Sequence, residues 1–187
     1  MATASQIATG KVRFSFCNLF QPRAQQDGQE PKYGVTLIIP KTDKATLAKI
    51  NSAIEAAKAN YLARNAGKKV SKDLKTTLHD GDGERPNGEA FGEECKGAYV
   101  ITASSKSQPV ILYADKTPII DPKDLYSGCY GRAILNFYVY DVNGNKGVTA
   151  ALNGVMKLHD GEPLIAGIVR DSDWDSWEDE EDSELLG

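Results

Sequence analysis

Carboxylates are the residues of this sequence best suited to chemistry, and nine of them lie in residues 171–187, where no lysine or arginine interrupts them. Catalysis and metal binding need carboxylates held to within about 0.5 Å on rigid elements. A run of like charge repels itself, so we expect this tail to be disordered in isolation. The acids of the body are expected in or beside loops, without a catalytic spacing: Asp115, Asp121, Asp124 and Asp141. We therefore predict no catalytic residues and no enzyme, with a metal-dependent nuclease as the enzymatic alternative.

Local signatures of catalysis and metal binding are missing from the sequence. It contains no G-x-x-x-x-G-K-[ST], no H-E-x-x-H and no G-x-S-x-G. A stretch that begins at Asp80 resembles the start of a calcium loop, but Arg85 and Phe91 occupy the positions that need a glycine and a bidentate acid. Three widely spaced cysteines, with only two histidines, disfavour a zinc site and a disulfide framework. We therefore expect no metal, no cofactor and three free thiols.

Aromatic and basic residues interleave in residues 115–132, which also contain prolines and glycines typical of a loop. Such rings can stack on bases, at about 1–3 kcal/mol for each base, while the cations neutralise phosphates. The same residue types elsewhere complete the candidate DNA-binding set: Lys11, Arg13, Arg23, Lys32, Tyr33, Tyr99, Lys106, Tyr113, Lys116, Lys123, Tyr126, Tyr130, Arg132 and Tyr138. Phe16 and Phe20 are weaker candidates, because packing in the core is the more common role for a strand phenylalanine. For each cation, a solvated surface position is an equally good interpretation.

Charge divides the chain into two parts, a body of residues 1–170 and the acidic tail. Removing the nine negative charges of the tail from the formal net charge of −4 leaves the body at +5. The tail can be a simple solubilising segment, but exposed tryptophans and leucines are costly in such a role. We therefore predict that it is a linear ligand for a basic groove with an apolar floor, in a partner or in this protein's own body. The residues predicted to bind there are Trp174, Trp177, Asp179, Glu180, Glu181, Asp182, Leu185 and Leu186.

The elements that must position the candidate residues begin with two strands. Residues 11–20 alternate with a period of two, which predicts one apolar face made by Val12, Phe14, Phe16 and Phe20. Residues 33–40 are β-branched and apolar and end at a proline, as expected for a second, antiparallel strand. An amphipathic helix should follow, with Thr42 or Asp43 as its N-cap and Gly67 beyond its end.

The second half of the body is predicted to be mostly strands. Residues 68–97 show no periodicity and are expected to form a long flexible loop, either a flap over an anionic ligand or a solvated excursion. Strands should return at 98–103 and 110–114, and a hairpin should join 131–141 to 148–158 through Asn143-Gly144. About six strands with one inserted helix favour a small, partly closed barrel. The N-terminus lacks a signal peptide and no apolar run is long enough to span a membrane, so we expect a cytoplasmic protein.

Four segments in order, GKVRFSFCNLFQPR, KYGVTLIIPKTD, LYSGCYGRA and NGVMKLHDGEPL, resemble the bacteriophage single-stranded-DNA-binding proteins that were first catalogued as a domain of unknown function. The resemblance covers nearly the whole chain. It implies a mainly β, OB-fold-like, partly closed antiparallel barrel with one long inserted helix and an acidic tail. It also implies sequence-independent binding of single-stranded DNA during phage replication, recombination and repair.

The same resemblance implies that the tail recruits replication or recombination proteins. Related proteins often end in an aromatic residue, whereas this chain ends Leu-Leu-Gly, so Trp174 and Trp177 would have to act as the anchor. A homodimer is left open, and no membrane partner is expected. The alternative function is that of a non-enzymatic phage assembly or structural protein with a solubilising tail.

Overall fold

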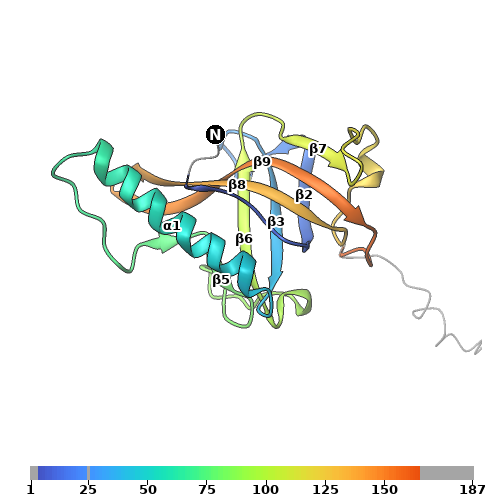
Figure 1. Cartoon of the computed structure of the whole chain (residues 1–187), viewed down its shortest axis with the longest axis horizontal. Coiled ribbons are helices and arrows are strands. Elements are labelled where there is room, and N and C mark those ends of the chain that lie inside the picture. Colours follow the sequence, from blue (N-terminus) through green and yellow to red (C-terminus); the bar gives the residue numbers. More distant parts are fainter. Residues whose placement is uncertain (1–3, 25, 165–187) are drawn as a thin grey trace, which may run out of the picture.

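A long antiparallel hairpin of β8 (Tyr130–Val142) and β9 (Asn145–His159) forms the centre of the fold. The computed structural model describes residues 4–24 and 26–164 (Figure 1). Asn143 and Gly144 join the two strands with φ values of 52° and 83°, the left-handed conformation that a two-residue hairpin turn requires. The hairpin, its turn and its inward face of Ala133, Leu135 and Phe137 are as the sequence predicts.

Five strands pair in a ring: β8, β2 (Val12–Arg23), β3 (Lys32–Pro40), β6 (Ala98–Ser105) and β9. The ring is only partly closed, since β2 pairs with β8, and β6 with β9, over two residue pairs each. Four shorter strands extend the sheet: β1 (Gln6–Ala8), β4 (Lys75–Thr76), β5 (Leu78–Asp80) and β7 (Val110–Tyr113). The mainly β, partly closed fold class is confirmed. Its pairing is mostly antiparallel, but β4, β6 and β7 each run parallel to β9.

The single long helix of the described residues, α1 (Lys44–Arg64), packs mainly against β8 (Figure 1). It begins where the sequence predicts, because the Asp43 carboxylate accepts a hydrogen bond of 3.1 Å from the Thr46 amide. It ends at Arg64, and Gly67 follows with a φ of 85°. The helix buries Leu47, Ile50 and Ile54 in the main core, beside Phe14 and Phe137. The three cysteines are free thiols.

The predicted apolar face of residues 11–20 is wrong from Ser15 onward. The pairing of β2 with β3 shifts register between Ser15 and Asn18, and Phe16 adopts a φ of 47° within this bulge. The bulge reverses the alternation, so that Leu19 is buried while Phe16 is 54% exposed. Phe20 is half-buried against the core. Core packing is the more common role for a strand phenylalanine, but as a prediction for Phe16 it is wrong.

Residues 68–97 contain more structure than the predicted loop. They form β4, β5 and a 3₁₀ turn, η1 (Glu93–Cys95), and β5 pairs with β6 in antiparallel register. Cys95 packs with Ile38, Ala98 and Val100 in a second small core, which Phe91 partly covers. The sequence shows no periodicity here because each of these pieces is only two or three residues long.

The alternation along β8 predicts a sharp difference between two neighbouring residues. Leu135 is fully buried, whereas Ile134 points outward and is 41% exposed. We expect Leu135→Ala to lower the free energy of unfolding by about 2–5 kcal/mol, because it leaves a core cavity. Ile134→Ala should cost less than about 1 kcal/mol. Urea unfolding of both variants provides the test, and equal losses would contradict this assignment of faces.

Candidate nucleic-acid interface

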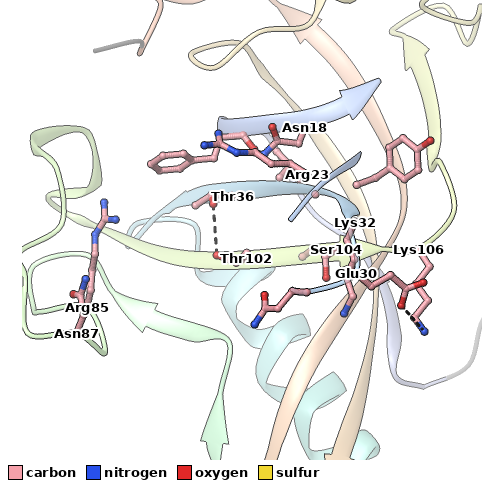
Figure 2. A pocket seen from close by; sticks show the side chains of 16 residues that line it. Asn18, Arg23, Glu30, Lys32, Thr36, Arg85, Asn87, Thr102, Ser104 and Lys106 are labelled. Atoms are coloured by element: carbon pink, nitrogen blue, oxygen red, sulfur yellow. Dashed lines mark hydrogen bonds and ion pairs between the residues drawn. The ribbon is translucent and has the colours of Figure 1, made fainter. Parts of the chain in front are cut away.

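An open groove of about 930 Å³ crosses the outer face of β3 and β6 (Figure 2). Its floor is made of small residues: Gly34 and Thr36 from β3, and Thr102 and Ser104 from β6. The hydroxyl oxygens of Thr36 and Thr102 lie 3.5 Å apart across the two strands. These residues alternate with Val35, Leu37, Ile101 and Ala103, whose side chains fill the core on the other face. The floor is therefore flat, polar and open to a ligand.

Cations dominate the sides of this groove. Arg23, Lys32, Arg85 and Lys106 line it, and the only carboxylate among the lining residues is Glu30. Glu30 lies 3.1 Å from Lys106 in an exposed ion pair. The lining therefore carries a formal net charge of +3, arranged along an open channel, which suits the phosphates of an extended polyanion.

Phe16 supplies an exposed ring to one side of the groove, and Arg85 lies next to it. The Arg85 guanidinium carbon is 6.0 Å from the centroid of the Phe16 ring and 5.4 Å from that of Phe91. Its Nε atom is buried without a hydrogen-bond partner among the described residues. Figure 2 shows Arg85 and Asn87 on a loop apart from the other lining residues. That loop brings a cation and a ring together at the edge of the groove.

The Arg85 loop is held by its own backbone. Glu84 pairs with Ala90, and the Arg85 amide donates to the Glu89 carbonyl at 2.7 Å. The Asn87 side chain accepts a hydrogen bond from the Glu89 amide. These contacts close a tight turn within residues 68–97, for which the sequence leaves a flap and a solvated excursion open.

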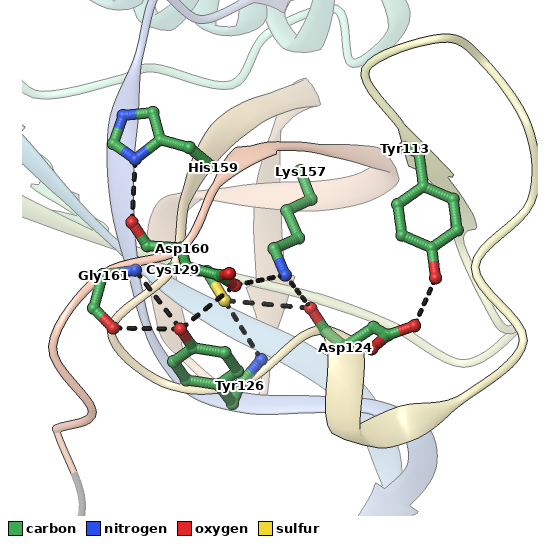
Figure 3. Close-up of polar contacts among 8 residues, drawn as sticks. All are labelled: Tyr113, Asp124, Tyr126, Cys129, Lys157, His159, Asp160 and Gly161. Carbon is green, nitrogen blue, oxygen red and sulfur yellow. Dashed lines mark hydrogen bonds and ion pairs between the residues drawn. The ribbon is translucent and has the colours of Figure 1, made fainter.

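A second cluster of candidate residues lies at the start of β8, in and around the loop that follows β7 (Figure 3). The Tyr126 hydroxyl donates to the Gly161 carbonyl at 2.9 Å, and Lys157 forms a 2.6 Å ion pair with Asp160. The Tyr113 hydroxyl donates to Asp124, which raises the pKa of Tyr113 above its ordinary value. Tyr126 therefore holds residues 160 and 161 against the loop, and Tyr113 holds Asp124 within it.

Tyr130 forms the centre of a separate aromatic and cationic patch. Its ring stacks on that of His159 at 4.7 Å, and the cationic groups of Lys11 and Arg13 lie 5.9 and 5.4 Å from its centroid. Arg13 also donates to the Gly128 and Glu162 carbonyls, at 3.2 and 2.6 Å. Lys11 is exposed and has no ion-pair partner among the residues described, so it is the more available cation of the two.

The fourteen candidates predicted from the sequence thus fall into separate places. The groove brings together Arg23, Lys32, Tyr33 and Lys106. Lys11, Arg13 and Tyr130 form the patch around Tyr130, and Tyr113 and Tyr126 lie in the cluster around the loop that follows β7. The others lie elsewhere: Tyr99, Lys116, Lys123, Arg132 and Tyr138. The predicted tail residues, Trp174 to Leu186, lie outside the described residues.

Some of the spread candidates already have partners. Tyr99 lies beneath Lys41, whose ammonium group is 5.3 Å from the ring centroid and binds Asp80 and Asp82 at 2.8 and 2.7 Å. Arg132 donates to the Thr9 carbonyl at 2.8 Å. Lys123 belongs to a short 3₁₀ turn, η2 (Pro122–Asp124), and is exposed.

Sequence reasoning missed several lining residues. Arg85 belongs to the long predicted loop, which gives no local signal of its position beside Phe16. Asn18, Gln29 and Asn87 add amides to the groove, and no spacing in the sequence connects them. Phe16 alone among the lining residues with an underestimated role has a signal in the sequence, because a strand phenylalanine is a weaker candidate for stacking on a base.

A ring of five strands with an open cationic groove over two of them defines an OB-fold-like protein, a class that binds oligonucleotides or oligosaccharides on its strand face. The chain belongs to the family described as Enterobacter phage Enc34, ssDNA-binding protein, whose sequence profile matches residues 5–185. It is also 31% identical, over 97% of its length and 98% of the relative's, to "Putative protein p50" of Acyrthosiphon pisum secondary endosymbiont phage 1.

Solved structures agree with this assignment. The single-stranded DNA-binding protein from bacteriophage Enc34, solved in complex with ssDNA, is 28% identical to this chain, with a TM-score of 0.75 over 87% of this chain and 91% of that one. The gp2.5 single-stranded DNA binding protein of bacteriophage T7 is 13% identical, with a TM-score of 0.61 over 94% of this chain and 96% of its own. At that identity the T7 structure supports the fold alone. Among the described residues, no helix is long and apolar enough to cross a membrane.

The position of Arg85 between two rings predicts how its loop is held. We expect Arg85→Ala to speed amide hydrogen exchange in residues 81–92, because the loop loses its contact with Phe16. Exchange in β8 and β9 should not change. Lys106→Ala is the matched control, because Lys106 is a cation of the groove that does not belong to residues 81–92. Unchanged exchange in residues 81–92 of Arg85→Ala would contradict a holding role for this side chain.

Proposed function

We propose that this protein binds single-stranded DNA without sequence preference, in the groove over β3 and β6. The main observation behind this proposal is that one open groove combines four cations, a floor of small polar residues and the exposed ring of Phe16. It acts without catalysis, in phage DNA replication, recombination and repair in the host-cell cytoplasm. Membership of the Enc34 family, and the relative solved with ssDNA, support this proposal.

The groove suits a single strand better than a duplex. Its floor of glycine, threonine and serine leaves room for unpaired bases to approach the sheet, while Arg23, Lys32, Arg85 and Lys106 neutralise phosphates along it. Phe16 stacks on one base, and any base offers a π-face, so the contact does not depend on sequence. Tyr33 is half-buried in the same lining and offers a second ring.

The acidic tail regulates this groove and recruits partners. With nine carboxylates it is a polyanion tethered to the same molecule, so it competes with DNA for the cations of the groove. When DNA displaces it, the tail becomes available to replication or recombination proteins. The tryptophans at 174 and 177 give such a partner apolar anchors within the acidic run.

Titration with a mixed-sequence oligonucleotide of about 30 nucleotides, with its duplex as control, tests the proposal. We expect salt-sensitive binding of the single strand and no cleavage in the presence of magnesium. If the four groove cations each contact one phosphate, log affinity should fall against log salt with a slope near −3, at about 0.7 per contact. Absence of binding would favour an assembly or structural protein, and cleavage would favour a nuclease.

The same titration with two alanine variants tests the position of the site. Phe16→Ala should weaken binding by about 1–3 kcal/mol, because one base loses its stacking partner. Ile120→Ala removes another exposed apolar side chain, 84% exposed and not among the groove-lining residues, and should have no effect. An unchanged affinity of Phe16→Ala would place the bases elsewhere.

Removal of residues 171–187 tests the role of the tail. We expect the shortened protein to bind single-stranded DNA more tightly than the full chain, with the largest difference at low salt, because charge competition is screened as salt rises. Equal affinities at low salt would contradict competition. Loss of folding would be visible as a lower midpoint of thermal unfolding, so the two effects can be told apart.

A further inference from the structure

A second pocket, of about 460 Å³, lies between the C-terminal end of α1 and β8. Tyr61, Arg64 and Lys68 line it from the end of the helix and the residues that follow, and Tyr138 lies on the β8 side. None of its described lining residues also lines the groove over β3 and β6. We call it the helix-end pocket. A ligand bound there would leave the groove free for DNA.

The lining of the helix-end pocket carries a formal net charge of +1, from Arg64 and Lys68 against Asp141. Asp141 accepts a hydrogen bond of 2.6 Å from the Tyr61 hydroxyl and forms an ion pair of 2.9 Å with Lys68. Lys146 lies 3.9 Å from the same carboxylate. Arg64 is exposed and has no ion-pair partner among the described residues, and three further exposed lysines follow along the chain: Lys69, Lys72 and Lys75.

Apolar and aromatic groups complete this pocket. Ala57 and Phe137 lie in its lining but are buried in the core, Val139 is half-buried, and the exposed ring is that of Tyr138, which is 46% exposed. The floor of the DNA groove, in contrast, consists of glycine and hydroxyl residues. The exposed Tyr138 ring and the exposed Arg64 give the helix-end pocket one aromatic and one cationic group for a ligand that combines negative charge with rings. The acidic tail, with Trp174 and Trp177, is such a ligand.

We propose that the helix-end pocket binds the acidic tail of a neighbouring molecule on the same DNA strand. The proposal rests on the function proposed above, because DNA in the groove is what releases the tail. The released tail then links one molecule to the next. Binding along the strand becomes cooperative through this contact.

Distances along the chain favour a neighbour over the molecule's own tail. The amide of Leu164 donates to the Ser127 carbonyl at 2.8 Å, which places the last described residue close to the beginning of β8. Tyr138 lies eight residues along β8 from Tyr130, or about 27 Å at the rise of an antiparallel strand. Trp174 is ten residues beyond Leu164, at most about 36 Å when fully extended. The chain's own Trp174 would thus reach Tyr138 only at about three quarters of its full extension, even along a straight path.

Figure 1 shows the same separation. The green end of α1 and the orange-red end of the described chain lie at opposite ends of the long axis. Molecules arranged end to end on a strand would bring the acidic tail of one beside the basic helix-end pocket of the next. Charge complementarity between the acidic tail of one molecule and the helix-end pocket of the next would orient all the molecules the same way along the strand.

Tryptophan fluorescence of the full chain tests this proposal, because both tryptophans of the sequence lie in the tail. The protein is bound to two labelled thymidine oligonucleotides, one that holds a single molecule and one that holds about four. Titration of each oligonucleotide with protein establishes how many molecules it holds. We expect a blue shift of the emission on the longer oligonucleotide and none on the shorter, because burial of the indole requires a neighbour.

Charge reversal identifies the pocket. Arg64→Glu should abolish the blue shift on the long oligonucleotide while leaving the affinity for the short one unchanged. Lys49→Glu makes the same charge change at an exposed position of α1 outside the pocket lining and should retain the shift. Circular dichroism and short-oligonucleotide binding establish that both variants are folded.

Each other outcome overturns the proposal. A blue shift that persists in Arg64→Glu would place the tail elsewhere. An equal shift on both oligonucleotides would assign the pocket to the molecule's own tail, and no shift on either would leave the pocket without this ligand. Failure of the labelled short oligonucleotide to bind at all would instead reject the proposed function, together with the inference that rests on it.

Discussion

The backbone pairing of β8 with β9 is the interaction on which the rest of the structure depends. These are the two longest strands of the described chain, and they pair along nearly their whole length. Strands β1 and β2 attach to β8, while β4, β6 and β7 attach to β9. Of the strands described, only β3 and β5 lack a direct pairing with this hairpin, and both join it through β6. The helix packs mainly on β8 as well. The hairpin therefore sets the position of every element that builds a surface for a ligand.

The outer face of β3 and β6 is divided between an apolar end and a polar end. Ile38 and Val100 lie at the apolar end, where Cys95 and the half-buried Phe91 cover them. Thr36 and Thr102 lie at the polar end and floor the groove. The chain that covers the first end also carries Arg85 to the edge of the second. One segment therefore both completes a small core and supplies a cation to the groove.

The parts of this structure that could be predicted from the sequence are those with a local signal. The Asn143-Gly144 turn, the alternation of β8 and the Asp43 cap depend on residues close together in the chain. The exposure of Phe16 could not be predicted, because the bulge that reverses β2 is set by its register with β3. The pieces of residues 68–97 are too short to show a period and are fixed by pairing with β6 and β9.

The same distinction holds for the candidate site. Residue types gave Arg23, Lys32, Tyr33 and Lys106, which the fold brings into one groove. They gave no means of separating these from Tyr113 or Tyr126, because an aromatic ring that anchors a loop and one that stacks on a base look alike in sequence. Arg85 was missed because its position beside Phe16 comes from contacts across the sheet.

The hydrogen bonds around Gly161 and Leu164 fix the point from which the rest of the chain starts. Tyr126 binds Gly161 and Ser127 binds Leu164, so the last described residues are hydrogen-bonded to the body. For a flexible tether, the effective concentration of its end falls with about the −3/2 power of its length once it can span the gap. In the competition proposed above, the number of residues between Leu164 and the first tail carboxylate, Asp171, would therefore set the effective concentration of the carboxylates at the groove.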